Sequence, residues 1–376
     1  MKQKCVMIIA GEASGDLHGS MLVKAMLEKN NTLFFVGVGG KALKEAGVKI
    51  FFDASEISVV GITEVFSRMP GILKAMFLVK KHLKNLRPDL LILIDFPDFN
   101  LRIASAAKKL GITVLYYISP QVWAWRPGRI KKMKGLIDHM AVILPFEKEY
   151  YKNHRIPVTF VGHPLLDTDV PVPNISYSGK KDDKFCIGLL PGSRDKEIMR
   201  HLPVMLETAS ILTKRLKNIK FIISLAPSVN RQPAEMLIEK YNPEIYFDVV
   251  SDIVGKVFER CTLVIAASGT VTLEAALSCK PMVIIYKVSP LTYLLGKAMI
   301  SVSHVSLVNL IMGKEIVPEL LQTDAVPENI SDIACELLND SDLYNRIQKK
   351  LYSIRDVLGG PGASERTAQI ALSLLS

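Results

Sequence analysis

Short apolar runs alternate with longer helix-like stretches along the whole chain. The strand-like runs cover 5–10, 33–36, 90–94, 113–117, 140–144 and 159–161, and then 186–190, 221–225, 245–249, 263–266 and 282–286. Continuous apolar runs are typical of strands buried on both faces of a parallel sheet, and parallel strands need crossover connections, usually helices. The alternation therefore predicts an α/β fold in which helices cover both faces of the sheets.

The rhythm lapses once, between Pro164 and Lys184, where prolines and polar residues replace the strand–helix pattern. A chain of 376 residues also exceeds what one hydrophobic core usually holds. We therefore expect two doubly wound, Rossmann-like domains that face a cleft. The N-terminal domain would span 1–165, a linker would span 166–184, and the C-terminal domain would begin at 185.

Composition limits the cellular compartment and the kinds of partner that the protein can have. No apolar run approaches the roughly 18 residues that a membrane-spanning helix needs. The five cysteines have no CxxC spacing and are odd in number, which predicts reduced thiols in a cytosolic protein. The net charge of +10 fits nucleic acids, anionic lipids or phosphorylated substrates, and does not choose among them.

Two aspartates, Asp95 and Asp98, follow the strand-like run 90–94, and the chain turns at Pro97 before a helix begins near Phe99. Ligands of open α/β sheets bind outside the carboxyl ends of such strands. A carboxylate at this edge can take a proton from an incoming hydroxyl. An aspartate before a helix more often acts as its cap, but two acids, two aromatic neighbours and a proline exceed what a cap requires.

The second half contains two loops of the kind that hold phosphate. LPGSR at 190–194 and ASGT at 267–270 each follow a strand-like run and open a helix. Free backbone N–H groups and the helix dipole favour an anion at each helix start. Arg194 can bind a diphosphate through two hydrogen bonds, and Glu274, one turn into the second helix, can accept from ribose hydroxyls. Each loop alone could be an ordinary cap, whereas the pair indicates a nucleotide diphosphate. Neither is a Walker A loop, and 37–40 does not fit GxGxxG, which weighs against an ATPase and a dehydrogenase.

A series of motifs then runs in order along nearly the whole chain. They are GEASGD at 11–16, DFPDFN at 95–100, SPQVWAWR at 119–126, LPFE at 144–147, FVGHP at 160–164, the two loops above, VSLVNL at 305–310 and ELLQ at 319–322. With these motifs the chain resembles the lipid-A-disaccharide synthases, two-domain glycosyltransferases of the GT-B type. The departures are small: Pro164 stands where some members have Thr, and Phe96 where others have Ala.

The resemblance implies a reaction. The enzyme would join UDP-2,3-diacylglucosamine to 2,3-diacylglucosamine 1-phosphate, forming a β-1,6-linked disaccharide and releasing UDP. Because the donor is α-linked and the product is β-linked, the transfer would invert the configuration at the anomeric carbon. A single displacement needs a base on the acceptor hydroxyl and charge stabilisation on the departing diphosphate. Asp98 is the candidate catalytic base.

The resemblance also assigns binding residues. The nucleotide would contact Arg194 and the two helix starts, and the family pattern adds two residues on the donor side. Three residues of the first motif would face the cleft, although they could equally cap the helix that starts near Gly15. The expected nucleotide-binding residues are Ser193, Arg194, Ser268, Gly269, Thr270, Glu274, Asn309 and Gln322, and the expected cleft residues are Glu12, Ser14 and Asp16.

We expect no metal or other cofactor. Asp167-Thr168-Asp169 matches the DxD pattern of metal-dependent glycosyltransferases, but it lies in the predicted linker rather than after a strand. The seven histidines form no HxH or HxxxH pair.

Acylated substrates imply contact with a membrane surface. The segment 62–86 has the residues for such contact. Beyond Pro70, a helical wheel puts Ile72, Met76, Val79, Leu83 and Leu86 on one stripe, which should pack on the sheet. Leu73 and Phe77 lie on an adjacent face beside lysines, and Phe66 and Met69 precede them. An apolar edge flanked by lysines is typical of an interfacial helix, and the alternative is a wide core stripe with a solvated lysine face. We favour a peripheral protein on the cytoplasmic face of the inner membrane, where this edge contacts membrane lipids.

The chain end predicts an assembly. A charged helix over 343–358, the break Gly-Gly-Pro-Gly at 359–362 and a last helix to 374 follow the second domain. In GT-B enzymes the last helix commonly crosses back to the N-terminal domain, and this family exchanges C-terminal segments between subunits. We therefore expect residues 343–376 to pack on an N-terminal domain, in a homodimer with exchanged tails.

Two other functions remain open. Another GT-B-like UDP-sugar enzyme, such as the peptidoglycan N-acetylglucosaminyltransferase or a UDP-N-acetylglucosamine 2-epimerase, would share the nucleotide loops. A nucleic-acid-binding protein would use the basic clusters at 74–87 and 126–134, but no nucleic-acid-binding motif accompanies them. We expect no nucleic-acid partner.

Overall fold

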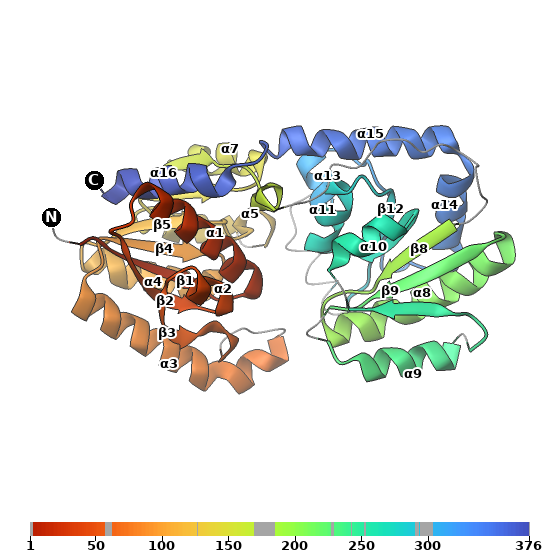
Figure 1. Ribbon diagram of the computed structural model, residues 1–376, viewed down its shortest axis with the longest axis horizontal. Helices are drawn as coiled ribbons and strands as arrows, with labels where there is room; N and C mark the ends of the chain where they lie inside the picture. Colours follow the sequence, from red (N-terminus) through yellow and green to blue (C-terminus); the bar gives the residue numbers. More distant parts are fainter. Residues whose placement is uncertain are drawn as a thin grey trace. The chain divides into compact units, whose positions relative to one another are not determined.

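The protein forms two α/β units (Figure 1). The computed structural model describes residues 3–56, 62–125, 127–168, 185–226, 229–241, 243–251, 253–289, 293 and 304–375, and for 62–68, 125 and 127 it describes the backbone alone. The first unit comprises Met1–Thr168 with Leu358–Ser376, and the second comprises Asp169–Val357. The predicted fold class is confirmed, since each unit is built on a parallel sheet. Most of the predicted linker, from residue 169 to 184, lies outside the described residues.

The first unit contains a seven-stranded sheet with the order β3-β2-β1-β4-β5-β6-β7. Its strands are β1 (Cys5–Ala10), β2 (Phe34–Gly39), β3 (Lys49–Asp53), β4 (Leu90–Ile94), β5 (Thr113–Tyr117), β6 (His139–Val142) and β7 (Val158–Phe160). All neighbours pair in parallel, and the strand order reverses direction between β1 and β4. Such a reversal opens a crevice at the carboxyl edge of a sheet, which is where ligands bind.

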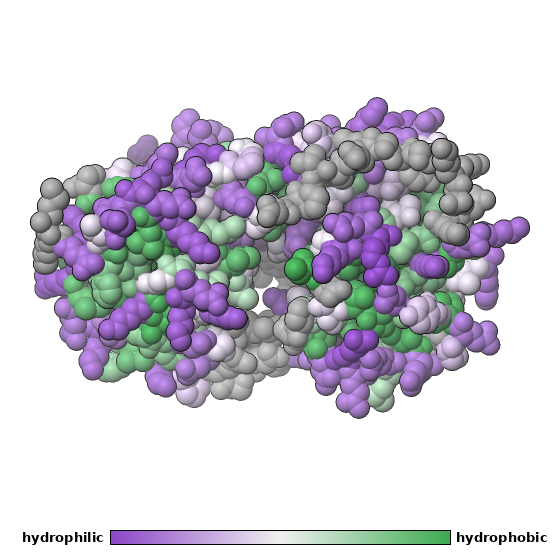
Figure 2. Space-filling model, in the orientation of Figure 1, coloured by the Kyte–Doolittle hydropathy of each residue, from purple (hydrophilic) through white to green (hydrophobic). Residues whose placement is uncertain are grey.

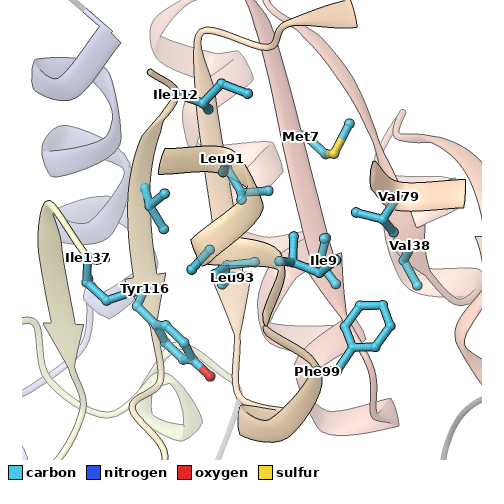
Figure 3. Close-up of a cluster of buried hydrophobic side chains, with 14 of the residues drawn as sticks. Met7, Ile9, Val38, Val79, Leu91, Leu93, Phe99, Ile112, Tyr116 and Ile137 are labelled. Carbon is cyan, nitrogen blue, oxygen red and sulfur yellow. The ribbon is translucent and has the colours of Figure 1, made fainter. Parts of the chain in front are cut away.

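Helices cover both faces of this sheet because its central strands send alternate apolar side chains to opposite sides. Met7 and Ile9 of β1 pack in one core, and Val6 and Ile8 in the other. Figure 3 shows the first of these cores, where Leu91 and Leu93 of β4 lie near Ile9 and Phe99. That face carries α3 (Ile62–Leu86), α4 (Pro97–Lys109), α6 (Ile130–Met133) and α7 (Pro145–Asn153), and the opposite face carries α1 (Ala13–Lys29), α2 (Lys41–Glu45) and α16 (Ala363–Leu375).

Short elements complete the first unit. They are η1 (Ala54–Glu56), α5 (Val122–Trp125), η2 (Pro127–Arg129) and η3 (Pro164–Asp167). The strand β3 was not predicted, because its sequence mixes lysine and aspartate with apolar residues at a sheet edge. Among the described residues, no helix is both long and apolar enough to span a membrane.

The second unit repeats the plan with a six-stranded sheet in the order β10-β9-β8-β11-β12-β13. Its strands are β8 (Phe185–Leu190), β9 (Ile219–Ser224), β10 (Phe247–Val250), β11 (Leu263–Ala267), β12 (Met282–Tyr286) and β13 (Glu319–Leu321). Its helices are α8 (Asp195–Arg215), α9 (Arg231–Tyr241), α10 (Val254–Arg260), α11 (Thr270–Leu277), α13 (Leu307–Met312), α14 (Pro327–Asn339) and α15 (Ser341–Val357). The strand order reverses between β8 and β11, so both predicted phosphate loops lie beside the reversal. Figure 2 shows hydrophilic side chains over much of the visible face of each unit, with apolar ones between them.

The C-terminal helices belong to different units, which corrects the expectation that 343–376 packs as a whole on an N-terminal domain. Helix α15 packs on α11, α13 and α14 of the second unit, and only the chain from Leu358 onward belongs to the first. There α16 lies along α1 of the same chain. The Asp167 carboxylate accepts hydrogen bonds from the backbone N–H groups of Gly362 (2.7 Å), Ala363 (3.0 Å) and Ser364 (2.8 Å), and so caps α16. An acid at a helix N-terminus stabilises it.

Candidate active site

The loop after β4 is held in an unusual backbone conformation. Asp95 and Phe96 both adopt left-handed dihedral angles, with φ of 44° and 47°. The side-chain amide of Asn100 donates to the carbonyls of Ile94 (3.1 Å) and Asp95 (2.7 Å), and the Tyr116 hydroxyl also donates to the Asp95 carbonyl. Two consecutive non-glycine residues in this region are costly and persist only where surrounding contacts fix them, typically at functional sites. Sequence reasoning did not single out Asn100 or Tyr116.

The loop after β1 approaches the same place closely. A Cβ added to Gly11 would lie 2.5 Å from the Phe96 ring, so only glycine fits. Burial, and then the nearby Glu12 carboxylate, raise the pKa of Asp95 to about 6. The switch point of the first sheet therefore brings Glu12 and Asp95 together, with the Asp95 carboxyl group largely buried.

Asp98 lies in the first turn of α4 and points outward. Its side chain is 77% exposed and forms an ion pair with Arg129 of η2, whose side chain is only 19% exposed. Phe96 occupies the N-cap position of α4 without a capping hydrogen bond, and Asp98 lies in the first turn rather than at the cap. An exposed carboxylate with one oxygen held by a fixed guanidinium is oriented and open to a substrate hydroxyl.

The three predicted cleft residues have different roles. Glu12 occupies the N-cap position of α1 without a capping hydrogen bond, and Ser14 is exposed. The Asp16 carboxylate instead accepts hydrogen bonds from the N–H groups of Gly40 (2.6 Å), Ala42 (2.9 Å) and Leu43 (3.3 Å). Asp16 therefore caps α2, which corrects the expectation that it faces the cleft.

A buried carboxylate, Glu147, organises the loop after β5, and sequence reasoning gave it no role. It accepts hydrogen bonds from the Ser119 hydroxyl (2.6 Å), the Trp123 indole N–H (3.0 Å) and the Leu144 N–H (3.1 Å). Burial raises the pKa of Glu147 to about 7. The available signal was the co-occurrence of the 119–126 and 144–147 motifs, since Glu147 joins them.

In the second unit, an unpredicted carboxylate lies at the first phosphate loop. Gly192 has a φ of 128°, which only glycine adopts readily. The Glu197 carboxylate accepts from the Ser193 N–H (3.1 Å) and pairs with the Arg194 guanidinium (3.1 Å). Ser193 and Arg194 are both exposed. The amide and the guanidinium thus already bind an anionic group, the Glu197 carboxylate.

The second helix start is open toward the part of the chain that the structure describes. Gly269 is the N-cap of α11, and a Cβ added to it would meet no atom of the described residues within 4 Å. Ser268 is half-buried and Thr270 is exposed. Burial raises the pKa of Glu274, which follows one turn later. These residues have the free surface that a ligand needs.

The structure contradicts the assignment of Asn309 to the donor side. Asn309 is fully buried, and its side chain bonds to the Glu319 carboxylate (2.7 Å), the Val317 carbonyl (2.8 Å) and the Ile316 N–H (2.8 Å). Its hydrogen-bonding capacity is used inside the protein, so it supports the chain around 305–319 rather than a ligand.

Gln322 has a similar internal role. It adopts a φ of 50°, and its side-chain amide accepts from the Val288 N–H (2.7 Å) and donates to the Val288 carbonyl (3.2 Å). Its side chain therefore fixes the loop after β12, and its contact with the nucleotide stays a prediction.

Helix α3 exposes most of the predicted membrane edge. Met69, Leu73 and Phe77 are exposed, Phe77 by 67%, whereas the side chain of Phe66 lies outside the description. Met76, Val79 and Leu83 are buried and Ile72 is half-buried, as the predicted core stripe requires. Leu86 is 43% exposed, because the helix ends there and leaves the sheet, so its assignment to the core was wrong.

Asp167 of the DxD pattern is occupied as the cap of α16, and Asp169 lies outside the described residues. Within the described ranges, no group of three or more His, Cys, Asp or Glu side chains is arranged to hold a metal ion.

The chain is similar to solved structures in fold. The structure of a putative UDP-N-acetylglucosamine 2-epimerase from Listeria monocytogenes gives a TM-score of 0.65 at 13% identity, over 99% of this chain and 96% of that one. A UDP-N-acetylglucosamine 2-epimerase from Neisseria meningitidis bound to UDP-GlcNAc gives a TM-score of 0.64 at 12% identity, over 98% of this chain and 100% of that one. The glycotransferase of kitacinnamycin gives 0.62 at 13% identity, over 100% of both chains. At these identities the likeness shows the fold alone.

Sequence comparison is more specific. The chain is 47% identical to the lipid-A-disaccharide synthase of Syntrophus aciditrophicus, over 100% of this chain and 99% of that protein. It is 46% identical to the lipid-A-disaccharide synthase of Geobacter metallireducens, over 99% of this chain and 97% of that protein. The family model described as lipid-A-disaccharide synthetase matches residues 6–374. With both sheets and their carboxyl-edge loops inside that match, this chain belongs to the lipid-A-disaccharide synthase family.

Proposed function

We propose that this protein is an inverting hexosyltransferase that forms the lipid A disaccharide. It transfers 2,3-diacylglucosamine from UDP to the 6-hydroxyl of 2,3-diacylglucosamine 1-phosphate, giving the β-1,6-linked disaccharide 1-phosphate and UDP. The observation that carries the proposal is full-length membership of the family, since the relatives at 40–47% identity bear that name. The alternatives, a peptidoglycan transferase or an epimerase, are matched only in fold.

The acceptor side lies at the switch point of the first sheet. Asp98 accepts the proton of the attacking hydroxyl, and Arg129 orients it through their ion pair. Asp95 differs because its carboxyl group faces inward with a raised pKa, and its carbonyl anchors the loop. Its burial suits a role in holding the loop and, while protonated, in donating a hydrogen bond to a sugar oxygen.

The donor side lies at the two helix starts of the second unit. Ser193, Arg194, Ser268, Gly269 and Thr270 bind the diphosphate, and the Glu274 carboxylate binds the ribose. Arg194 and the backbone amides stabilise the negative charge that develops on the leaving UDP. Because these groups are positive and already positioned, we propose a reaction that needs no metal ion.

The acyl chains enter from a membrane surface. Exposed Met69, Leu73 and Phe77 lie on α3 with exposed Lys74, Lys80, Lys81 and Lys84, a combination suited to anionic lipid headgroups. We infer a peripheral protein on the cytoplasmic face of the inner membrane, active as a homodimer.

The test is to incubate the protein with UDP-2,3-diacylglucosamine and with UDP-N-acetylglucosamine, each with and without the acylated acceptor. Mass spectrometry should detect a disaccharide 1-phosphate only with the acylated donor and acceptor together. Epimerised UDP-N-acetylglucosamine without acceptor would establish the epimerase instead. Transfer of unacylated N-acetylglucosamine would favour the peptidoglycan type of enzyme.

A further inference from the structure

A buried histidine of the second unit lies between the loop after β8, which contains the first predicted phosphate loop, and the loop after β12. His201 is on the second turn of α8 and its side chain is 1% exposed. Its Nδ1 lies 3.0 Å from the carbonyl oxygen of Pro191, in the loop after β8. Its Nε2 lies 3.1 Å from the backbone nitrogen of Lys287, just after β12. One imidazole thus connects two carboxyl-edge loops.

These two partners determine the protonation state of the ring. A carbonyl oxygen can only accept, so Nδ1 carries the proton, and a backbone N–H can only donate, so Nε2 has the lone pair. The ring is therefore neutral with a single tautomer. Burial lowers the pKa of His201 below its ordinary value, which agrees with this geometry.

Residues that contact or face the ring also contact the first predicted phosphate loop. The Tyr286 ring of β12 stacks on it, with centroids 6.4 Å apart and planes at 28°. The charged groups that face it are Glu197 and Arg200 from α8. Arg200 also donates to the Lys287 carbonyl (3.4 Å), and Glu197 holds Ser193 and Arg194.

The loop after β12 is fastened on its other side as well. Gln322 bonds to both backbone groups of Val288, and the Lys287 ammonium donates to the Ala325 carbonyl (3.1 Å). His201 is thus the link from this fastened loop to the glycine-containing turn Pro191–Arg194. A nucleotide bound at this turn depends on that link, because the link fixes where the turn lies.

We propose that His201 is a positioning residue of the nucleotide site, which fixes the phosphate-binding turn relative to the loop after β12 through its neutral imidazole. The inference deepens the proposed function, because it rests on UDP binding at the turn Pro191–Arg194. His201 does not touch the nucleotide. It acts through the backbone of Pro191 and Lys287.

The experiment measures UDP affinity of the full chain by calorimetry for His201→Leu, His201→Asn and His201→Gln. Asparagine keeps a donor near Nδ1, and glutamine keeps an acceptor near Nε2, so each preserves one bond. We expect the leucine variant to bind UDP about tenfold more weakly, because it loses both hydrogen bonds that fix the turn. The UDP affinities of the asparagine and glutamine variants should lie between those of the leucine variant and the wild type. His154→Asn, an exposed histidine of the first unit, is the control and should bind UDP normally.

Steady-state kinetics and pH separate positioning from general stability. The KM for the UDP-sugar should rise in the His201 variants while the KM for the acceptor stays constant. Wild-type UDP affinity should also fall as acid protonates His201, because Nε2 then faces the Lys287 N–H as a second donor. That part of the pH dependence should vanish in His201→Leu, whereas any part due to Glu274 should remain.

Wild-type UDP affinity in all three variants, with only a lower melting temperature, would overturn the proposal. If leucine prevents folding, the asparagine and glutamine variants decide the question in the same way. Wild-type protein that binds UDP but forms no disaccharide would reject the proposed function and leave the His201 inference standing. Absence of UDP binding by the wild type would reject both.

Discussion

At the scale of residues, two aspartates three positions apart have opposite surroundings. Asp95 faces inward, where burial and Glu12 raise its pKa to about 6, and its carbonyl receives two side-chain donors. Asp98 faces outward on Arg129. Pairs of acids whose surroundings differ in this way usually divide the roles at an active site. We therefore assign the proton transfer to Asp98 and the loop geometry to Asp95.

This division predicts the outcome of two isosteric substitutions. Asp98→Asn should lower turnover by ~100-fold or more, the usual loss when a general base is removed, with UDP affinity near wild type. Asp95→Asn should cost less, because the backbone carbonyl that anchors the loop remains. Single-turnover rates and calorimetry measure both. Turnover of Asp98→Asn within a few-fold of wild type would rule out Asp98 as the base.

Glu147 predicts a pH dependence of stability. Burial raises its pKa from 4.5 to about 7, so folding favours the protonated form. The stability it contributes is present below its unfolded pKa and is lost as pH rises toward its folded pKa. The melting temperature of the first unit should carry a falling component between pH 4.5 and about 7. Glu147→Gln should remove that component, and a variant with the wild-type slope would contradict the assignment.

At the scale of elements, α3 shows what periodicity predicts and what it misses. The 3.6-residue period correctly separated the buried Met76, Val79 and Leu83 from the exposed Leu73 and Phe77. The period wrongly predicted that Leu86 is buried, because a helical wheel contains no information on where the sheet beneath the helix ends. The segment singled out in the sequence, 62–86, coincides with the helix, which runs from Ile62 to Leu86 and contains Pro70.

The exposed edge of α3 predicts a separation of membrane binding from stability. Replacing Met69, Leu73 and Phe77 by serine should greatly weaken binding to anionic vesicles, since each apolar side chain contributes up to ~1.5–3 kcal/mol of transfer free energy. The melting temperature should barely change, because these side chains are already exposed. Val79→Ser, in the core, is the converse control and should lower the melting temperature without a specific effect on vesicles. A collapse of stability in the triple variant would identify an ordinary core helix.

At the scale of the whole molecule, the sequence predicted the two parallel-sheet units and placed the candidate site on loops at the carboxyl edges of their strands. Strand–helix alternation depends on the composition of short segments, so it can be recognised in the sequence. Side-chain networks cannot be recognised there, because they join residues distant in sequence. Asp16 bonds to Gly40, Asp167 to Gly362, and Asn309 to Glu319. A polar residue in a motif can serve such a network or a ligand, and only its partners distinguish the two.

The tail predicts a testable assembly. Gly359, Gly360 and Gly362 have φ of 86°, 67° and 96°, so the segment before α16 is a hinge of left-handed glycines. The docking of α16 on α1 and Asp167 could be made by the same helix of a second copy, since exchange needs only an opened hinge. Light scattering at micromolar concentration should therefore give a dimer, and truncation after Val357 should abolish it. A monomeric full-length protein would contradict the exchanged tail.

The most direct test of the central claim is the configuration of the new glycosidic bond. Asp98 as a base and Arg194 at the leaving diphosphate describe one displacement, which turns an α-linked donor into a β-linked product. Nuclear magnetic resonance of the purified disaccharide gives this configuration from the anomeric proton coupling. We predict a β-1,6 linkage in the wild-type product. An α-linked product, or no disaccharide from UDP-2,3-diacylglucosamine and the acylated acceptor, would contradict the account.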